Sequence, residues 1–294
     1  MDGGTDRVGF GLFAAYSILA GGNAVGVRFS NRELDPFWGA TFRFGTAALL
    51  MLLLMVLLGH RMPRGRALAG AAIYGLLAFG GAFAFAFYAL VQLEAGFGQI
   101  LLSIVPLVTL LLVAIQKVER LRGISLVGAL VSLTGVVLMS GLSFEGTLPI
   151  PSILAGIGSA FCFAQASITI KRFPQSHPIV VNAVGMTTGA IFLGLLTAIS
   201  GDEVALPQQA DTWWAVVYMV LVGSVAVFSI YVALLERWEA SRANYGFVVI
   251  PIVTVLVSAW LLDEPITLGV ILGGALVLAG VYYGALRQPT ITSR

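Results

Sequence analysis

Long apolar runs separated by short polar links dominate the pattern along this chain. Ten such runs of about 20 residues lie at 8-27, 36-58, 67-90, 97-116, 123-142, 149-170, 178-199, 212-235, 243-262 and 267-286. A transmembrane helix needs about 20 predominantly apolar residues, whereas a membrane-spanning strand alternates in polarity over about 10 residues. The runs are twice that length and apolar on all faces. The pattern therefore predicts an all-α integral membrane protein with ten transmembrane helices.

The composition supports a membrane bundle and excludes several other classes. The chain is 59% hydrophobic and 10% charged, with a mean hydropathy of +0.97, against about 45 to 50% apolar and about 25% charged in soluble domains. The longest link, 201-211, is too short to form a domain, so we expect the bundle itself to carry the function. The single cysteine, Cys162, lies inside the sixth run and excludes a cysteine metal cluster. We expect no cofactor, and the net charge of +2 suggests no nucleic-acid partner.

The basic residues predict the orientation of the chain in the lipid bilayer. Cytoplasmic links are enriched in Lys and Arg. The two tails and the even-numbered links hold 13 of the 16 Lys and Arg residues, and the odd-numbered links hold only Arg28 and Arg32. We therefore expect both the N-terminus and the C-terminus to be cytoplasmic, in a multi-pass protein of the cytoplasmic membrane.

A repeat becomes visible when the chain is shifted by 145 residues against itself. Residues 93-140 then align with 238-285 without a gap, and 12 of these 48 positions are identical. The identities include Pro106 with Pro251, Thr109 with Thr254, Glu119 with Glu264 and Gly135 with Gly280. Each half contains five spans, an odd number, so the second half must enter the membrane from the opposite side. We predict two inverted repeats, 1-145 and 146-294, an architecture shared by many secondary transporters.

The segments 106-119 and 251-264 are each followed by a glycine-rich span, GISLVGALVSLTGVVLMSG in the first half and LGVILGGALVLAGVYYG in the second. With the inverted five-span halves, this pattern resembles the drug/metabolite transporter superfamily, and within it the EamA-type exporters, from about residue 8 to 286. The resemblance implies a bacterial inner-membrane exporter of aromatic or other apolar amino acids or similar metabolites, working by alternating access. It also implies a single chain that is functional as a monomer, because both halves of the cavity are present in one chain.

Arg43 is the main candidate for substrate binding. It is the only basic residue well inside a predicted span, about 10 Å from the outer end of that span at 1.5 Å per residue. A buried guanidinium can hold a substrate carboxylate through charge-assisted hydrogen bonds. The alternatives are a structural ion pair with Glu94 or Asp35, or a side chain that reaches to the membrane surface.

Aromatic and polar residues inside the spans complete the predicted substrate site. Phe79 and Phe83 are four residues apart and share a helix face with Phe87, with Tyr88 on a neighbouring face, and Phe228 and Tyr231 form the counterpart in the second half. The polar candidates are Asn23, Gln99, Ser103, Gln165, Asn244 and Tyr245. The alternative for each aromatic residue is plain packing, and for each polar residue a hydrogen bond between helices.

Two other functional classes are weaker interpretations. An intramembrane enzyme would need a recognisable catalytic motif, and the sequence contains none; a P-loop for ATP is also absent. A channel or facilitator would call for a filter loop or a ring of charges, and neither is visible. For the prolines at 106 and 251, which lie in mid-span, we predict a matched pair of bends beside the cavity.

Overall fold

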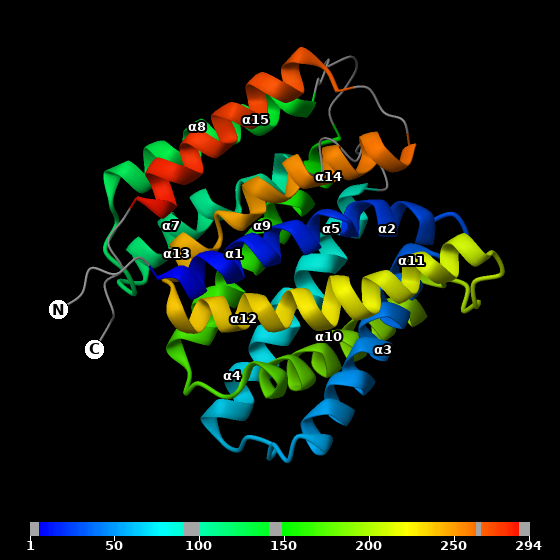
Figure 1. The fold of residues 1–294 in the computed structure, drawn as a ribbon. Coiled ribbons are helices and arrows are strands. Elements are labelled where there is room, and N and C mark those ends of the chain that lie inside the picture. Colours follow the sequence, from blue (N-terminus) through cyan, green and yellow to red (C-terminus); the bar gives the residue numbers. More distant parts are fainter. Residues whose placement is uncertain (1–5, 91–99, 141–148, 263–265, 288–294) are drawn as a thin grey trace.

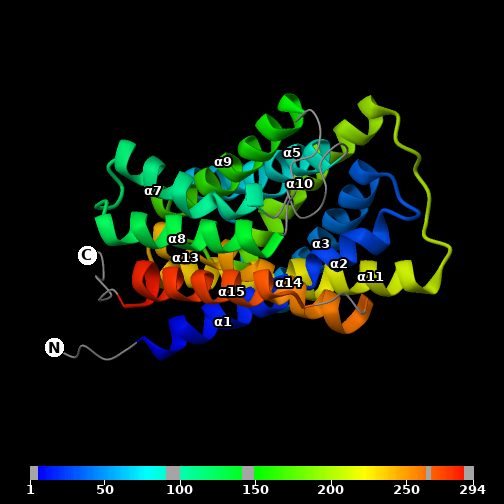
Figure 2. The same ribbon diagram turned by 90° about the horizontal axis from the view of Figure 1, so that it is seen from above.

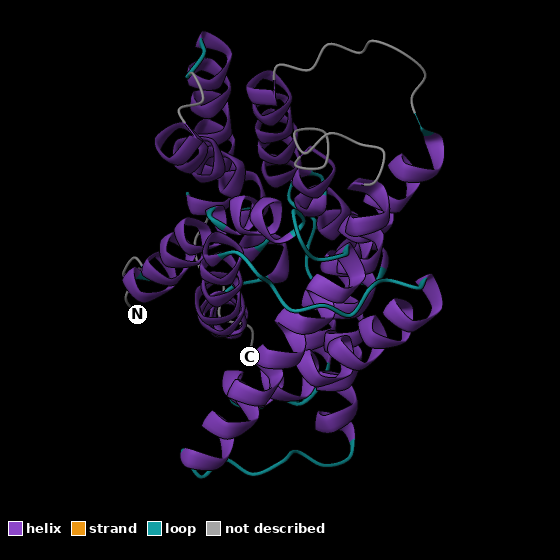
Figure 3. Cartoon of the chain, turned by 90° about the vertical axis from the view of Figure 1, so that its right-hand side faces the viewer, coloured by secondary structure: helices purple, strands orange, loops and turns teal. Residues whose placement is uncertain are grey.

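The protein is an entirely helical bundle over residues 6-90, 100-140, 149-262 and 266-287, which a computed structural model describes (Figure 3). Within these residues, nine helices are long and apolar enough to cross a membrane, and Ile100–Ile115 is a shorter apolar helix. These ten helices fall on the ten predicted runs. The prediction of an all-α membrane protein is confirmed.

Several spans are built from more than one helical segment. The first half contains α1 (Arg7–Gly21), α2 (Asn23–Ser30), α3 (Pro36–Leu57), α4 (Arg66–Gly75), η1 (Leu76–Gly81), α5 (Ala82–Leu90), α7 (Val105–Ile115) and α8 (Gly123–Ser140). The second half contains α9 (Ile150–Arg172), α10 (Pro178–Ser200), α11 (Ala210–Val220), η2 (Leu221–Ala226), α12 (Val227–Arg237), α13 (Ala240–Ala243), α14 (Gly246–Leu262), α15 (Leu268–Val281) and η3 (Tyr282–Leu286).

Proline and capping side chains mark the helix ends. α10 starts with Pro178, and the His177 side chain accepts a hydrogen bond from the backbone N–H of Ile179. The same helix ends at Gly201, which adopts a left-handed conformation with φ 77°. Proline fits the first helical turn because its missing N–H has no partner there, and glycine tolerates a positive φ. The sequence thus sets where this span begins and ends.

Helices from the two halves pack as antiparallel pairs. α8 and α15 run side by side (Figure 1, Figure 2), with Gly128 opposite Gly280 and Gly284, and Gly135 opposite Gly273. The order of these contacts reverses along the two helices, so α8 and α15 are antiparallel. The predicted repeat makes these two spans equivalent. Their antiparallel packing is what we expect when an odd number of spans inverts the second half relative to the first.

α3 and α10, the second spans of the two halves, form another such pair. The hydroxyls of Thr41 and Thr197 lie 3.1 Å apart near one end. At the other end, the rings of His60 and His177 stack with centroids 4.1 Å apart. The start of α1 and the end of α15 lie at this second end of the bundle, which we call the termini end (Figure 1). The opposite end is the far end.

The structure treats the two mid-span prolines differently. In the fourth span the helix is interrupted at Ile104 and resumes at Val105, so Pro106 stands in the first turn of α7. α14 instead runs uninterrupted through Pro251, and the ninth span is interrupted at Asn244, between α13 and α14. The interruption near Pro106 is as predicted, but it has no match at Pro251.

Two π-helical segments form a matched pair that the sequence comparison did not include. η1 begins at Leu76 and η2 at Leu221, and the difference is again 145 residues. The same shift places Phe83 on Phe228. Short π-helical turns frequently mark functional sites, because they displace the backbone and side chains that follow. Both segments lie near the middle of their spans.

Candidate functional site

Arg43 lies on the inner face of α3 and is held against η2. Its Nε donates to the Ser224 hydroxyl over 2.8 Å, and its Nη2 donates to the Gly223 carbonyl over 2.9 Å. Nη2 also donates to Oδ1 of Asn23 over 3.1 Å. The remaining nitrogen, Nη1, faces the Met219 sulfur at 3.8 Å. The site therefore joins spans 1, 2 and 8, and it brings the predicted residue Asn23 to Arg43.

Among the described residues, no carboxylate forms an ion pair with Arg43. Asp35, one of its predicted alternative partners, accepts the backbone N–H of Glu203 instead, over 2.8 Å. Glu94, the other, lies outside the described residues. Arg43 is only 3% exposed, so its side chain does not reach the surface. A thioether is a weak acceptor, so Nη1 keeps donors for an anionic ligand.

Phenylalanine rings surround the guanidinium. Its central carbon lies 4.9 Å from the ring centroid of Phe44 and 5.5 Å from that of Phe83. These two rings are 4.7 Å apart, and the Phe79 and Phe228 rings meet at the same distance. Phe44 and Phe79, at 5.2 Å, join the two pairs. Three predicted aromatic residues, one of them from the second half, thus form one apolar layer beside the only buried cation of α3.

A small cavity opens beside Arg43 toward the far end. It is lined by Val27, Ser30, Asn31, Gly39, Ala40, Arg43, Phe44, Phe83, Phe87 and Met219. The lining is apolar except for one cation and a few polar groups. Its chemistry suits the anionic group of a small metabolite, for which the helices around it must move apart.

A second polar cluster lies toward the termini end. The Asn244 side chain accepts from the Tyr231 hydroxyl over 2.5 Å and donates to the Thr109 hydroxyl over 2.7 Å and the Ser167 hydroxyl over 3.0 Å. All four residues are buried. These bonds fasten spans 4, 6, 8 and 9 to one another, which seals this half of the bundle. Asn244 and Tyr231 therefore lie together, as predicted, but separate from Arg43.

Three other predicted polar residues are described by the structure. Gln165 accepts a hydrogen bond from Gln116 over 2.6 Å, which joins α9 to the end of α7. Ser103 is buried in the fourth span. The Tyr245 hydroxyl donates to the Ser125 carbonyl of α8 and packs beside Gly284. Gln99 lies outside the described residues.

Tyr88 lies on α5 but faces away from the phenylalanine layer. It is 52% exposed, whereas Phe79 is fully buried. Phe83 comes five positions earlier on the same α-helix, and five steps of 100° place the two side chains about 140° apart. The close spacing of aromatic residues in this span could not distinguish the core face from the surface. Tyr88 therefore has no place in the site described here.

Residues that pattern reasoning missed hold the site together. Ser224 and Gly223 bind Arg43 from η2, and Thr109 and Ser167 bind Asn244. Small residues in apolar spans usually serve helix packing, so a single sequence gives no reason to assign them to a site.

The first residue before α1 ties the termini end together. The Asp6 carboxylate accepts from the backbone N–H of Gly9 over 3.0 Å and from the Trp238 indole over 3.1 Å, and it lies 3.5 Å from Arg237. The Gly9 hydrogen bond is the main cause that lowers the pKa of Asp6, while partial burial opposes it; Trp238 and Arg237 lower the pKa further. This contact links the start of span 1 to the end of span 8.

Comparisons with known proteins agree with this architecture. The inner membrane transporter YedA of Escherichia coli (strain K12), itself uncharacterized, is 28% identical over 260 residues, which cover 88% of this chain and 84% of YedA. A protein of Salmonella typhimurium (strain LT2) named a probable amino-acid metabolite efflux pump is 26% identical over 220 residues, 71% of this chain and 74% of that protein.

One solved crystal structure has the same fold. It superimposes with a TM-score of 0.77 over 95% of both chains, at 20% sequence identity. The model of the EamA-like transporter family matches residues 7–141 and again residues 150–284. These names indicate a transporter and not an enzyme. The chain is a multi-pass membrane transporter that belongs to the EamA-like transporter family.

Proposed function

We propose that this protein is a secondary transporter that exports small metabolites, namely amino acids with aromatic or other apolar side chains, across the cytoplasmic membrane. The observation that carries the proposal is the environment of Arg43. Its guanidinium is buried, has no carboxylate partner among the described residues, and lines a cavity between phenylalanine rings. Removing a charge from water is costly unless a partner compensates it. A substrate carboxylate is the partner that the site lacks.

The two kinds of group around the cavity match the two ends of an amino acid. Nη1 faces only the Met219 sulfur, so it can donate to a carboxylate oxygen. Phe44 and Phe83 offer flat apolar surfaces to a side chain beside that carboxylate. The name of the Salmonella relative, a probable amino-acid metabolite efflux pump, supports both the substrate class and the direction.

The difference between the two ends of the bundle supports transport by alternating access. Asn244 and its partners fasten the termini end, while the cavity beside Arg43 lies toward the far end. Helix pairs such as α3 and α10 contain one member from each half, so the halves can exchange roles. With the basic links in the cytoplasm, the termini end is cytoplasmic. We propose that one chain suffices for transport.

The test is transport by purified protein in proteoliposomes. Labelled phenylalanine and leucine are offered with and without a pH gradient, and each amino acid is compared with its uncharged amide as a competitor. If Arg43 binds the carboxylate, the amide competes at least about tenfold more weakly, because one charge-assisted bond is worth about 1.5 to 3 kcal/mol. If no amino acid is transported or competes, the proposed substrate is wrong.

Two variants of Arg43 separate substrate binding from structure. In Arg43→Gln the preference for the acid over the amide should disappear, and Arg43→Lys should keep part of it because the charge remains without the planar fork. Thermal unfolding of both variants in detergent provides the control. Arg43 would have a structural role if two results came together: the Gln variant unfolds readily, and the wild type does not distinguish the acid from the amide.

A further inference from the structure

Three tyrosines from three helices gather in the half of the bundle nearer the termini end. Tyr16 comes from α1, Tyr74 from α4 and Tyr231 from α12, and each is at most 4% exposed. The rings of Tyr16 and Tyr231 lie 5.1 Å apart. Tyr74 meets Phe79 at 5.5 Å, so the tyrosines continue the phenylalanine layer toward the termini end.

Two of the three hydroxyls have no hydrogen-bond partner in the part of the chain that the structure describes. Tyr231 donates to Asn244, but the hydroxyls of Tyr16 and Tyr74 are buried and unpaired. Buried polar groups in native proteins are nearly always paired, so each exception requires an explanation. Phenylalanine would fill the same space without a lone hydroxyl. The hydroxyls therefore point to a partner that they bind in another state of the bundle.

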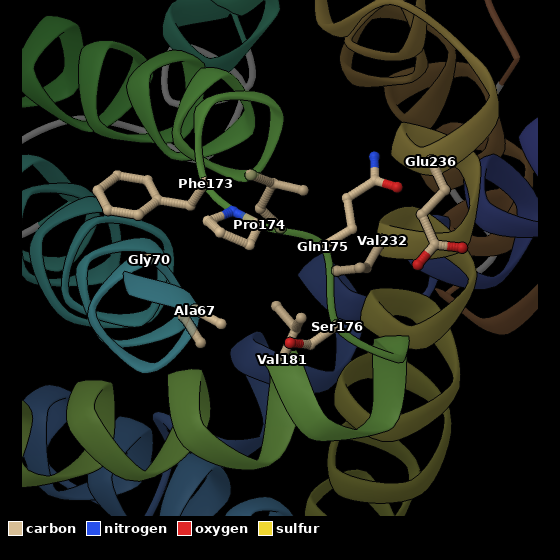
Figure 4. A pocket seen from close by; sticks show the side chains of 11 residues that line it. Ala67, Gly70, Phe173, Pro174, Gln175, Ser176, Val181, Val232 and Glu236 are labelled. Atoms are coloured by element: carbon tan, nitrogen blue, oxygen red, sulfur yellow. The ribbon is translucent and has the colours of Figure 1, made fainter. Parts of the chain in front are cut away.

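A small pocket lies at the termini end, on the same side of the bundle as these tyrosines. It is enclosed by α4, α10, α12 and the link that follows α9 (Figure 4). Ala71 and Val181 line it, and Tyr74 stands one turn deeper than both: it is three residues after Ala71 on α4 and touches Gly185, four residues after Val181 on α10. A small opening between these helices would join the cavity to Tyr74.

The chemistry along this route favours a positively charged group. Of the described residues that line the cavity, Glu236 alone is charged, and Lys171 and Arg237 interact with it from outside the lining. Beyond it, the tyrosines offer hydroxyl oxygens as acceptors and aromatic faces for a cation. An ammonium group needs acceptors of this kind, and no described residue of the lining is a cation that would hold a carboxylate.

We propose that Tyr16, Tyr74 and Tyr231 form a second substrate subsite, which takes the ammonium group of an amino acid that enters from the termini end. This inference rests on the proposed function. Ser224, which holds Arg43, and Tyr231 are seven residues apart on one span, or about 10 Å. That separation exceeds the distance between the ammonium and carboxylate groups of one amino acid. The substrate therefore occupies the two subsites one after the other.

The experiment compares amino acids with analogues that lack only the ammonium group. Phenylalanine and leucine are tested in proteoliposomes against their 2-hydroxy acids, with substrate on the termini side, for wild type and for Tyr16→Phe/Tyr74→Phe. The wild type should prefer the amino acids by about tenfold or more. The double variant should lose most of that preference through a higher KM for the amino acids, with the hydroxy acids unchanged.

Thermal stability separates a binding role from a structural one. Because the two hydroxyls are unpaired in the resting bundle, the double variant should unfold at the same temperature as the wild type or higher. The matched control is Tyr218→Phe, which loses a paired hydroxyl that donates to the Leu19 carbonyl over 2.8 Å. It should unfold at a lower temperature and keep the preference for amino acids.

Each other outcome overturns the inference. A double variant that keeps the full preference shows that the hydroxyls do not meet the substrate. A double variant that loses stability as Tyr218→Phe does shows that they are bonded within the protein. A wild type that transports hydroxy acids and amino acids equally refutes the ammonium subsite and leaves carboxylate recognition intact. A wild type that transports neither refutes the proposed function as well.

Discussion

The contact between α8 and α15 depends on the absence of a side chain at Gly135. A Cβ atom added there would lie 2.5 Å from the Gly273 carbonyl oxygen and 2.8 Å from the Val277 side chain. Ordinary contact begins at 3.4 Å, so the two helices must separate by about 0.9 Å (3.4 − 2.5) to accept Gly135→Ala. The nearest atoms include backbone, which cannot rotate away.

The size of the effect follows from this separation. A gap of 0.5 to 1 Å forfeits roughly a quarter to a half of each atom-atom attraction, and overpacking typically costs about 1 to 3 kcal/mol. In lipid, packing is a main source of helix association, because the bilayer is as apolar as the side chains. We therefore expect Gly135→Ala to lower the free energy of unfolding by about 1 to 3 kcal/mol.

A neighbouring glycine provides the matched control. Gly274 lies on α15 next to the contact, but a Cβ atom there would meet nothing within 4 Å. Alanine favours a helix over glycine by up to about 1 kcal/mol, so Gly274→Ala should be neutral or stabilising. Equilibrium unfolding in mixed micelles with increasing SDS measures both variants. If Gly135→Ala is as stable as Gly274→Ala, the close approach does not hold the two repeats together.

Two further predictions concern the termini end. Asn244→Leu nearly keeps the side-chain volume but removes three interhelical hydrogen bonds. At roughly 0.6 kcal/mol for each bond, the variant should lose about 2 kcal/mol of unfolding free energy in the same assay. A loss below about 0.5 kcal/mol would contradict the role of Asn244 in fastening the helices. Asp6 has a folded pKa below its ordinary value of 3.8, so its stabilising effect is present above that pH and is lost as pH falls through the lower folded value. The stability difference between wild type and Asp6→Asn should therefore shrink as the pH falls below about 4. A difference that does not change with pH would exclude the contacts with Gly9 and Trp238 as its source.

The substrate site shows where pattern reasoning succeeds. A lone cation in an apolar span is conspicuous, because its burial needs an explanation, so Arg43 stood out from the sequence. Asn244 stood out as a polar residue inside a span and Tyr231 as an aromatic counterpart of the first-half phenylalanines, and the structure joins them. The phenylalanines were found through their helical spacing, but spacing along one helix contains no information about which face meets another helix. That is why Tyr88 was included in the site with Phe79, although Tyr88 is half exposed and Phe79 is fully buried.

Both prolines illustrate the same limit. The repeat in the sequence equated Pro106 with Pro251, and it led to the inverted halves that the antiparallel contacts of α8 and α15 bear out. A missing backbone N–H weakens a helix at any proline, but surrounding helices decide whether the chain breaks there. In the fourth span the break lies at Ile104, and in the ninth it lies at Asn244, where hydrogen bonds from three other helices hold the irregular backbone.

By itself, the sequence determined the class of protein, the ten spans, the repeat and the family, because the length and polarity of a span must match the bilayer and paired residues persist between the halves. Only the tertiary structure decided which side chains meet. It placed Ser224 and Asn23 on Arg43, fastened Asn244 to three other helices and left the hydroxyls of Tyr16 and Tyr74 unpaired. These contacts join residues up to 181 positions apart. They depend on the rotation and crossing of packed helices, which no local pattern specifies.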